Sequence, residues 1–177
     1  MNYHQTNLKN CLLIEPDIFS DSRGFFMETY NSKKYLEIGV GLGFVQDNFS
    51  YSYKNVLRGL HLQINEPQGK LVSVYHGEVY DVVVDLREDS PSFKKWQGFY
   101  LSHTNNKQLW VPPGFAHGFL VTSDYAYFSY KCSEFYNYND EACIAWNDPD
   151  LNIEWPVINP TVSEKDMNGK LLKDFLK

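Results

Sequence analysis

Apolar and polar residues alternate with a period of two along several segments of the chain, which is the pattern of strands that bury one face. The clearest pair of segments is Lys70–Tyr75 and Glu78–Leu86, which a turn at His76 and Gly77 joins into a hairpin. The same alternation predicts further strands at Asn55–Gln63, Gln97–Ser102, Gln108–Val111 and Tyr125–Lys131. We therefore expect a fold built mainly from antiparallel strands.

The second strand of that hairpin carries carboxylates on a face that is otherwise apolar. Asp81 and Asp85 lie on the same side as Val79 and Val83. Charged side chains are rare inside a packed sheet. We therefore expect this face to border a polar cavity.

Helical periodicity is scarce and is confined to short segments. One helix is predicted at Ser32–Ile38, and another begins at Ser163 and carries an apolar stripe of Leu171, Leu172, Phe175 and Leu176. Many short strands with a few short helices predict an all-β jelly-roll sandwich or barrel. The 177 residues contain no repeat or linker, so residues 1–177 are predicted to form a single domain.

The composition fits a folded domain and excludes several kinds of partner. Aromatic residues make up 16% of the chain, which allows far more burial than a disordered tail has. The net charge of −6 argues against general nucleic-acid binding, because that binding needs a basic surface. No apolar stretch approaches the ~20 residues of a membrane helix. The widely spaced Cys11, Cys132 and Cys143, and an N-terminus without a basic and apolar leader, predict a cytoplasmic protein with no membrane partner.

Arg58 and His61 are the first candidates for chemistry. A regular strand would place them on opposite faces, but Gly59 between them permits a bulge that turns both toward one cavity. Histidine takes and returns protons near neutral pH, although this segment also fits a histidine that is merely hydrogen-bonded in the core. Arg23, Arg58 and Lys70 each adjoin a glycine, which leaves room for an anion such as a phosphate.

His117 ends the sequence Pro-x-Gly-x-x-His, which is also the second metal-binding motif of cupin barrels. A metal site must therefore be considered at the Gly-rich turn that delivers this histidine. The first cupin motif needs a His-x-His pair, and the sequence contains none. We therefore predict no metal site.

Tyr130 and Asp166 each have a structural and a functional interpretation. Tyr130 fits a core aromatic residue, or a phenol that gives a proton inside a cavity. Asp166 follows Ser163 at the spacing of a capping box, in which it would bond the start of a helix. A carboxylate at this place could instead hold an imidazole in one tautomer.

The segments that carry these candidates follow one another in a specific order. They include Arg58-Gly59-Leu60-His61, Pro113-Gly114-Phe115-Ala116-His117 and Ser163-Glu164-Lys165-Asp166. The full set covers residues 19–30, 46–48, 56–61, 67–72, 77–87, 90–93, 113–119, 130–131, 146–149 and 163–166. Taken together, these segments resemble the dTDP-4-dehydrorhamnose 3,5-epimerase family over almost the whole chain.

The resemblance implies a cupin-type jelly roll that works without a metal or an organic cofactor. It also implies a homodimer in which part of each site comes from the other subunit. His61 would be the general base, and Asp166 would orient it. Tyr130 would be the acid on the opposite side of the sugar, and Lys70 would lie near the ketone oxygen.

The resemblance further implies a set of substrate-binding residues. The phosphates and the sugar would meet Arg23, Arg58, His117 and Lys165. Phe19 would supply an aromatic wall. The nucleotide and sugar would be held by Glu28, Gln46, Asp47, Asn48, Tyr136 and Glu141.

The implied function is inversion of carbons 3 and 5 of dTDP-4-dehydro-6-deoxy-D-glucose, by removal of the protons next to the C4 ketone. The alternative is an enzyme that inverts only one of these centres, on this or a related nucleotide-bound keto sugar. A cupin that only binds a sugar or nucleotide, and a metal-dependent cupin oxygenase, are two further classes. The joint presence of His61, Tyr130 and Asp166 favours the epimerase.

Overall fold

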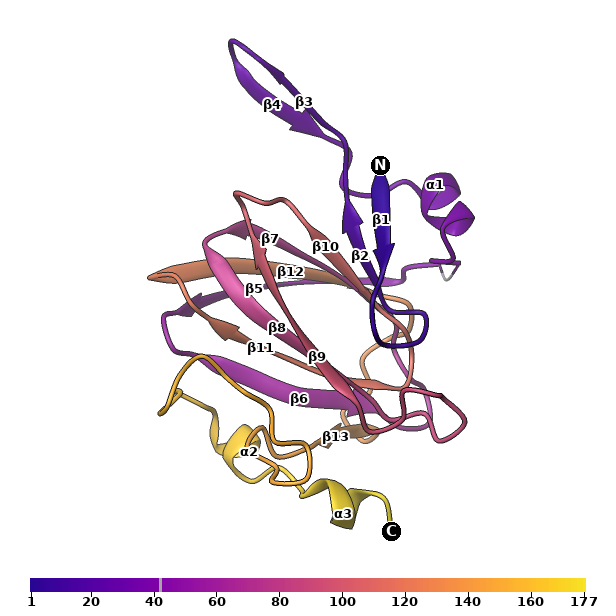
Figure 1. Cartoon of the computed structure of the whole chain (residues 1–177), viewed down its shortest axis with the longest axis vertical. Coiled ribbons are helices and arrows are strands. Elements are labelled where there is room, and N and C mark those ends of the chain that lie inside the picture. Colours follow the sequence, from indigo (N-terminus) through magenta and orange to yellow (C-terminus); the bar gives the residue numbers. More distant parts are fainter. Residues whose placement is uncertain (42) are drawn as a thin grey trace.

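The computed structural model describes residues 1–41 and 43–177 and is an antiparallel β-sandwich (Figure 1). The larger sheet has the order β1 (Asn2–Gln5), β2 (Leu12–Glu15), β10 (Gln108–Val111), β7 (Lys70–His76), β12 (Tyr125–Cys132) and β5 (Gln46–Tyr53). The smaller sheet has the order β13 (Glu141–Cys143), β6 (Leu57–Gln63), β11 (Phe115–Val121), β8 (Glu78–Asp85) and β9 (Trp96–Ser102). This arrangement confirms the predicted jelly-roll fold with short helices.

Every strand that the alternation predicts is present. These strands are β6 to β10 and β12, and each matches its predicted bounds to within two residues. The strand β5 escaped prediction because its pattern is reversed: polar Asn48 and Ser50 point inward, while Phe49 and Tyr51 are more exposed. The strand β11 escaped because all of its residues are buried and therefore show no alternation. His117 lies within this strand, directly after the Gly-rich turn.

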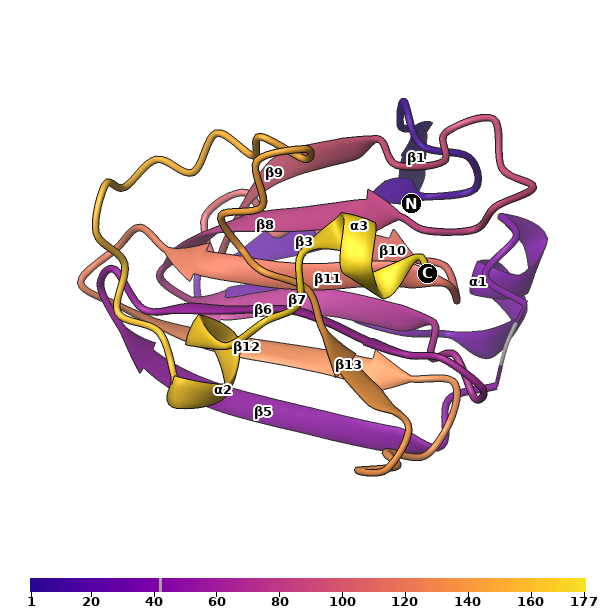
Figure 2. The same ribbon diagram turned by 90° about the horizontal axis from the view of Figure 1, so that it is seen from below.

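Apolar side chains fill the space between the two sheets. The larger sheet contributes inward residues such as Val72, Leu109 and Phe128, and the smaller sheet contributes Val83 and Phe119. A second cluster covers the outer face of the smaller sheet, where Leu60 and Val82 pack beneath the C-terminal segment. Figure 2 shows this segment lying across β6 and β11. Both faces of the smaller sheet are therefore covered.

The C-terminal segment does not form the single helix predicted from Ser163. It forms α2 (Glu164–Met167) and α3 (Leu172–Phe175), with Gly169 and Lys170 between them. The amide of Lys170 donates to the carbonyl of Cys143 at 2.9 Å, so the chain here pairs with the end of β13. A Cβ at Gly169 would lie 2.8 Å from the amide nitrogen of Ala145, so this close approach needs a glycine.

The helix α1 (Ser32–Glu37) lies at the edge of the larger sheet, and its bounds match the predicted ones to within one residue. The side chain of Asn31 caps its first turn, accepting a hydrogen bond from the amide of Lys33 at 3.1 Å. None of the helices in residues 1–41 and 43–177 is long and apolar enough to cross a membrane.

The strands β3 (Ile18–Asp21) and β4 (Gly24–Met27) form a hairpin that projects away from the sandwich (Figure 1). Its apolar side chains are largely in solvent: Phe19 is 62% exposed, Phe25 61% and Phe26 69%. Contiguous exposed apolar surface of this kind marks an interaction site.

The predicted polar face of β8 is only partly confirmed. Asp81 and Asp85 do share the inner face with Val79 and Val83, and both carboxylates are fully buried. Asp81 lies behind His117, which lines a cavity. Asp85 instead lies at the other end of the strand, where Arg87, Ser90 and Ser92 enclose it. The expectation of a cavity at Asp85 is therefore wrong.

Asp85 is expected to make stability depend on acid pH. Burial tends to raise its pKa, but the hydrogen bonds from Arg87, Ser90 and Ser92 outweigh burial and lower the pKa from 3.8 to about 2. The folded pKa lies below the unfolded one, so this stabilisation is present above about pH 4 and is lost as the pH falls toward 2. Its size is on the order of 2 kcal/mol.

Urea unfolding across this acid range measures the effect. Asp85→Asn should lower the free energy of unfolding at neutral pH and flatten its decline below about pH 4. The control is Asp150→Asn, which removes an exposed carboxylate. Equal acid dependence in the wild type and in Asp85→Asn would contradict the assignment.

Candidate active site

A cavity of about 410 Å³ opens between the two sheets near α2. The smaller sheet and α2 provide His61, His117 and Asp166 on one side, and the larger sheet provides Lys70 and Tyr130 on the other. The remaining lining residues are Asn48, Phe49, Ser50, Arg58, Gly118, Phe119, Phe128, Ser163 and Lys165. The structure thus brings together all of the predicted catalytic residues and, of the predicted substrate-binding residues, Asn48, Arg58, His117 and Lys165.

A bulge at Gly59 turns both Arg58 and His61 toward this cavity, as the sequence predicted. His117 of β11 pairs with His61 of β6, and Phe119 of β11 pairs with Arg58 of β6. Between these two pairs the chain advances by two residues along β11 but by three along β6. The strand β6 therefore has one extra residue at this place. Gly59 has a φ of +129°, and a Cβ on it would lie only 2.5 Å from the Cα of Gly118.

Replacing Gly59 with alanine should damage both the fold and the site. The added methyl group forces β6 and β11 apart, and we expect a loss of about 1–3 kcal/mol in the free energy of unfolding. Gly24→Ala is the matched control, because Gly24 has the same φ of +129° but nothing within 4 Å of a Cβ. Urea unfolding of both variants measures the difference. Equal losses would show that backbone strain, and not the strand contact, decides the result.

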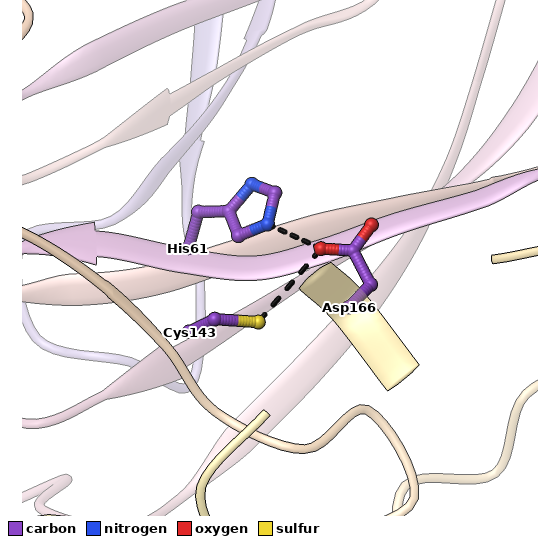
Figure 3. A group of neighbouring side chains, drawn as sticks. All are labelled: His61, Cys143 and Asp166. Carbon is purple, nitrogen blue, oxygen red and sulfur yellow. Dashed lines mark hydrogen bonds and ion pairs between the residues drawn. The ribbon is translucent and has the colours of Figure 1, made fainter. Parts of the chain in front are cut away.

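His61 and Asp166 form a hydrogen-bonded pair at the cavity wall (Figure 3). Nε2 of His61 lies 2.5 Å from Oδ1 of Asp166, and the Asp166 side chain is almost fully buried. Burial tends to raise the pKa of Asp166, but the hydrogen bonds from His61 and Ser163 lower it below 3.8. A carboxylate only accepts hydrogen bonds, so Nε2 carries the hydrogen and Nδ1 keeps the free lone pair. This pair therefore presents a base.

The cap at Ser163 explains how Asp166 reaches this place. The hydroxyl of Ser163 accepts a hydrogen bond from the amide of Asp166 at 3.1 Å, which is half of a capping box. The carboxylate of Asp166 turns away from the helix start and binds His61. The structure thus contains both the cap and the contact with His61, and the cap positions the carboxylate.

Tyr130 stands on the opposite wall from His61, on β12 of the larger sheet. Burial raises the pKa of its phenol to about 12, with further increases from Cys132 and Glu141 that Arg58 partly offsets. The phenol therefore keeps its proton at neutral pH. This position and this protonation state suit a general acid.

Lys70 lies on β7, beside β12 in the same wall, and only 8% of the residue is exposed. Burial lowers the pKa of its ammonium group. Within the described residues no carboxylate lies within ion-pair distance of this group and no hydrogen bond is formed by it. The ammonium is therefore available to an anionic oxygen in the cavity.

His117 and Arg58 complete the polar lining. Nε2 of His117 lies 2.9 Å from the buried carboxylate of Asp81, which fixes the imidazole against the wall. The guanidinium of Arg58 donates to the hydroxyl of Ser52 at 3.0 Å, and it forms no ion pair within the described residues. Arg58 therefore has donors left for an anion.

A chain of hydrogen bonds runs along the rim of the cavity. The side chain of Gln46 donates to Asn48 at 3.0 Å and accepts from the amide of Tyr136 at 2.9 Å. The hydroxyl of Tyr136 donates to Glu141 at 2.8 Å, and Glu141 forms an ion pair with Lys165. Asn48 and Lys165 line the cavity, whereas Gln46, Tyr136 and Glu141 contact these two residues or one another outside the lining.

The remaining predicted site residues lie outside this cavity in a single copy of the chain. Phe19 and Arg23 are on the projecting hairpin. The side chain of Arg23 is 88% exposed, and among the described residues it binds only Asp21. Glu28 pairs with Lys34 at 2.8 Å. Asp47 is an exposed residue of β5 and forms an ion pair with Lys131 of β12.

The sequence did not point to Ser50, which lines the cavity, or to Cys143, which lies next to it. Ser50 lies two residues beyond Asn48, so the period of β5 could have identified it once that strand was recognised. Its hydroxyl is buried and has no hydrogen-bond partner within the described residues. Cys143 lies beside the pair of His61 and Asp166, with Sγ 3.8 Å from Oδ1 of Asp166 (Figure 3), and no spacing in the sequence pointed to it.

The arrangement suits proton transfer at a planar intermediate. A base lies on one wall, a neutral phenol lies on the other, and a buried ammonium stands beside the phenol. A carbon between the walls can lose a proton from one face and regain one on the other, which inverts its configuration.

His61, Cys143 and Asp166 also offer atoms that metals bind, all within 4.8 Å of one another.

Comparison with known proteins gives a consistent result. A family model described as dTDP-4-dehydrorhamnose 3,5-epimerase matches residues 5–174. The chain is 53% identical over 177 residues to a protein of that name from Shigella flexneri, covering 98% of this chain and 97% of the relative.

Solved structures show the same similarity. A dTDP-6-deoxy-D-glucose-3,5-epimerase from Legionella pneumophila, in complex with dTDP-4-keto-L-rhamnose, has a TM-score of 0.94 and 49% identity, with 97% of this chain and 93% of that chain covered. A 3'-monoepimerase from Streptomyces bikiniensis, in complex with dTDP-quinovose, has a TM-score of 0.89 and 32% identity, with 96% of this chain and 87% of that chain covered.

Proposed function

This chain belongs to the dTDP-4-dehydrorhamnose 3,5-epimerase family, and from that premise we propose how its cavity inverts a sugar. It is an isomerase that inverts carbons 3 and 5 of dTDP-4-dehydro-6-deoxy-D-glucose and gives dTDP-4-dehydro-L-rhamnose. The observation that carries the proposed mechanism is the placement of the His61–Asp166 pair on one wall and of Tyr130 on the opposite wall.

The first step is removal of a proton next to the C4 ketone. The carbonyl acidifies the hydrogens on carbons 3 and 5, because the electrons of the broken C–H bond move onto the ketone oxygen. Nδ1 of His61 takes the proton, and the resulting imidazolium is stabilised by the carboxylate of Asp166. Asp166 also keeps the imidazole in the tautomer that leaves Nδ1 free.

Lys70 stabilises the enolate that this step creates. Lys70 is buried in the cavity wall and has no carboxylate partner in residues 1–41 and 43–177, so its ammonium can interact fully with the negative ketone oxygen. A preorganised donor of this kind typically contributes ~10²–10³ in rate.

Tyr130 then completes the inversion. Its phenol gives a proton to the face of the carbon opposite His61, and the electrons of the enolate form the new C–H bond. One inversion leaves an imidazolium and a phenolate, and exchange with solvent returns both to their starting states. The same groups serve carbon 5 in a second round.

Cations and polar side chains around His61 and Tyr130 bind the phosphates and the sugar. We assign the phosphates to Arg58 and Lys165, which line the cavity and carry donors that suit phosphate oxygens. His117, held by Asp81, and Asn48 face the sugar. The rim chain of Gln46, Tyr136 and Glu141 orients Asn48 and Lys165.

Nuclear magnetic resonance of dTDP-4-dehydro-6-deoxy-D-glucose in D₂O with the protein tests this function. Deuterium should appear at both carbon 3 and carbon 5, in a product with both centres inverted. Deuterium at one carbon only would establish the single-centre alternative. The chain is 32% identical to the 3'-monoepimerase from Streptomyces bikiniensis and 49% identical to the 3,5-epimerase from Legionella pneumophila. The absence of deuterium at both carbons would overturn the epimerase assignment for this sugar.

The pH dependence of the rate should identify Lys70. Burial lowers the pKa of Lys70, so its charge is lost at a lower pH than that of an exposed lysine, and the rate should fall as the pH rises through that value. Tyr130, with its pKa raised to about 12, loses its proton only at a higher pH. In Lys70→Arg the side chain stays charged, and the alkaline fall in kcat should move to higher pH. An unchanged alkaline limb in this variant would contradict the role of Lys70.

We further propose that the enzyme is a homodimer in which the β3–β4 hairpin of one subunit completes the site of the other. A two-stranded hairpin that pairs with neither sheet is marginal alone, and this one exposes Phe19, Phe25 and Phe26. Phe19 and Arg23 are implied in substrate binding but lie outside the cavity of their own subunit. A second copy that receives the hairpin satisfies both observations.

Mixed dimers test this proposal. Arg23→Ala and His61→Asn should each give weakly active dimers. Their co-expression should recover about a quarter of the wild-type activity, because half of the dimers are mixed and each mixed dimer has one intact site. Activity no greater than that of the two variants alone, or sedimentation as a 20.7 kDa species only, would contradict the proposal.

We also place the enzyme in the cytoplasm as one domain spanning residues 1–177. Cys11, Cys132 and Cys143 are all free thiols, which fits a reducing compartment. Fractionation of cells, with the enzyme found in the soluble cytoplasmic fraction, tests the location.

A further inference from the structure

We propose that His61, Cys143 and Asp166 form a binding site for a thiophilic divalent cation such as Zn²⁺, and that a cation bound there blocks the base. A ring nitrogen of His61, Sγ of Cys143 and a carboxylate oxygen of Asp166 lie within 4.8 Å of one another. Figure 3 shows the three side chains converging on one point from separate segments of the chain. The part concerning the base rests on the function proposed above for His61.

The fold holds these side chains together independently of any ion. Cys143 of β13 is the direct cross-strand partner of His61 on β6, so the two side chains emerge side by side from the sheet. Asp166 approaches from α2, where the cap at Ser163 fixes the start of the helix. Two ligands on paired strands and one on a capped helix make a preorganised site.

The donor set suits zinc. Thiolate, imidazole and carboxylate are its usual protein ligands, and sites with three such ligands leave a fourth position for water. Zinc bond lengths in a tetrahedron place ligand atoms roughly 3.3–3.7 Å apart. Sγ of Cys143 already lies 3.8 Å from Oδ1 of Asp166, whereas Nε2 of His61 must move out from 2.5 Å. The Nε2–Oδ1 pair must open by about 1 Å, and the ligand atoms of His61 and Cys143, which lie within 4.8 Å of each other, must approach by up to about 1.2 Å.

Binding exchanges protons for metal bonds in a balanced way. Burial keeps Cys143 as a thiol, so its proton passes to water when the sulfur binds the cation. The hydrogen on Nε2 of His61 is replaced by one on Nδ1, through exchange with water, so the imidazole stays neutral and only the thiol proton is released. Nδ1 is the atom to which we assign proton abstraction, so the occupied site lacks the base.

Titration of the metal-free, reduced protein with Co²⁺ tests the site without reference to activity. Cobalt in the zinc position should show a thiolate-to-metal charge-transfer band that saturates at one equivalent and disappears when Zn²⁺ is added. Cys143→Ser should lose this band. Cys132→Ser, which changes the other thiol near the cavity, should keep it. No thiolate band in the wild type, or a band that Cys143→Ser retains, would overturn the site.

Inhibition by Zn²⁺ tests the consequence for the base. The wild-type rate should fall in step with occupancy, and Cys143→Ser, measured against its own metal-free rate, should need on the order of 10–100 times more Zn²⁺ for half inhibition. A cobalt band that depends on Cys143 together with an unchanged rate would establish the cation site and overturn His61 as the base. The failures of the two proposals are thereby distinguishable.

Discussion

Replacing His61 with asparagine is expected to lower kcat by roughly 10²–10⁴ while leaving substrate binding close to normal. Asparagine keeps a donor toward Asp166 but offers no basic lone pair at the place of Nδ1. Because both inversions begin with proton removal by this one group, deuterium incorporation at carbons 3 and 5 should fall by the same factor.

The rate of solvent exchange into dTDP-4-dehydro-6-deoxy-D-glucose measures this loss, and a binding titration shows whether affinity persists. His4→Asn is the control, because His4 is an exposed histidine on β1 that pairs with Glu15 and does not line the cavity. Wild-type exchange at either carbon in His61→Asn would contradict a single shared base.

Replacing Tyr130 with phenylalanine should separate the two halves of the reaction. The base is intact, so proton removal continues, but the wall opposite has lost its proton donor. Inverted product should fall by roughly 10²–10⁴. Deuterium should still enter the starting sugar with its configuration retained, because the protonated His61 returns a deuteron to the face from which it took the proton.

The comparison of retained with inverted deuterated sugar gives the decisive measurement. Tyr100→Phe serves as the control, since Tyr100 is 51% exposed on β9, outside the cavity lining. Equal loss of exchange and of inversion in Tyr130→Phe would mean that the phenol acts before or during proton removal, and that another group is the acid.

The sequence predicted those parts of the fold that follow from one buried face. The strands β6 to β10 and β12 alternate cleanly and were found, whereas β11, buried on both faces, carries no alternation to detect. The strand β5 reverses the usual pattern because its inner residues line a polar cavity and its outer residues are aromatic. The polar lining of the site is therefore the reason why β5 was not predicted from the sequence.

The candidate site was predictable where local rules and the family resemblance agreed. Gly59 between Arg58 and His61 indicated a bulge from strand geometry alone, and the register of β6 with β11 contains it. The meeting of His61 with Asp166, 105 residues apart, came from the resemblance and not from any spacing. Cys143 was missed because cross-strand neighbours depend on register, which sequence does not state.

Asp166 lies on a segment outside both sheets of the sandwich. It sits on a helix of one turn, which is not stable by itself, and the segment around it is tied to the sandwich by a few backbone bonds, such as that from the amide of Leu57 to Thr161 at 2.9 Å. Detachment of this tail is a local unfolding event, which needs less free energy than opening the sandwich. On heating, the enzyme would therefore lose the orientation of its base before it loses its fold, and catalysis has a lower melting point than the protein.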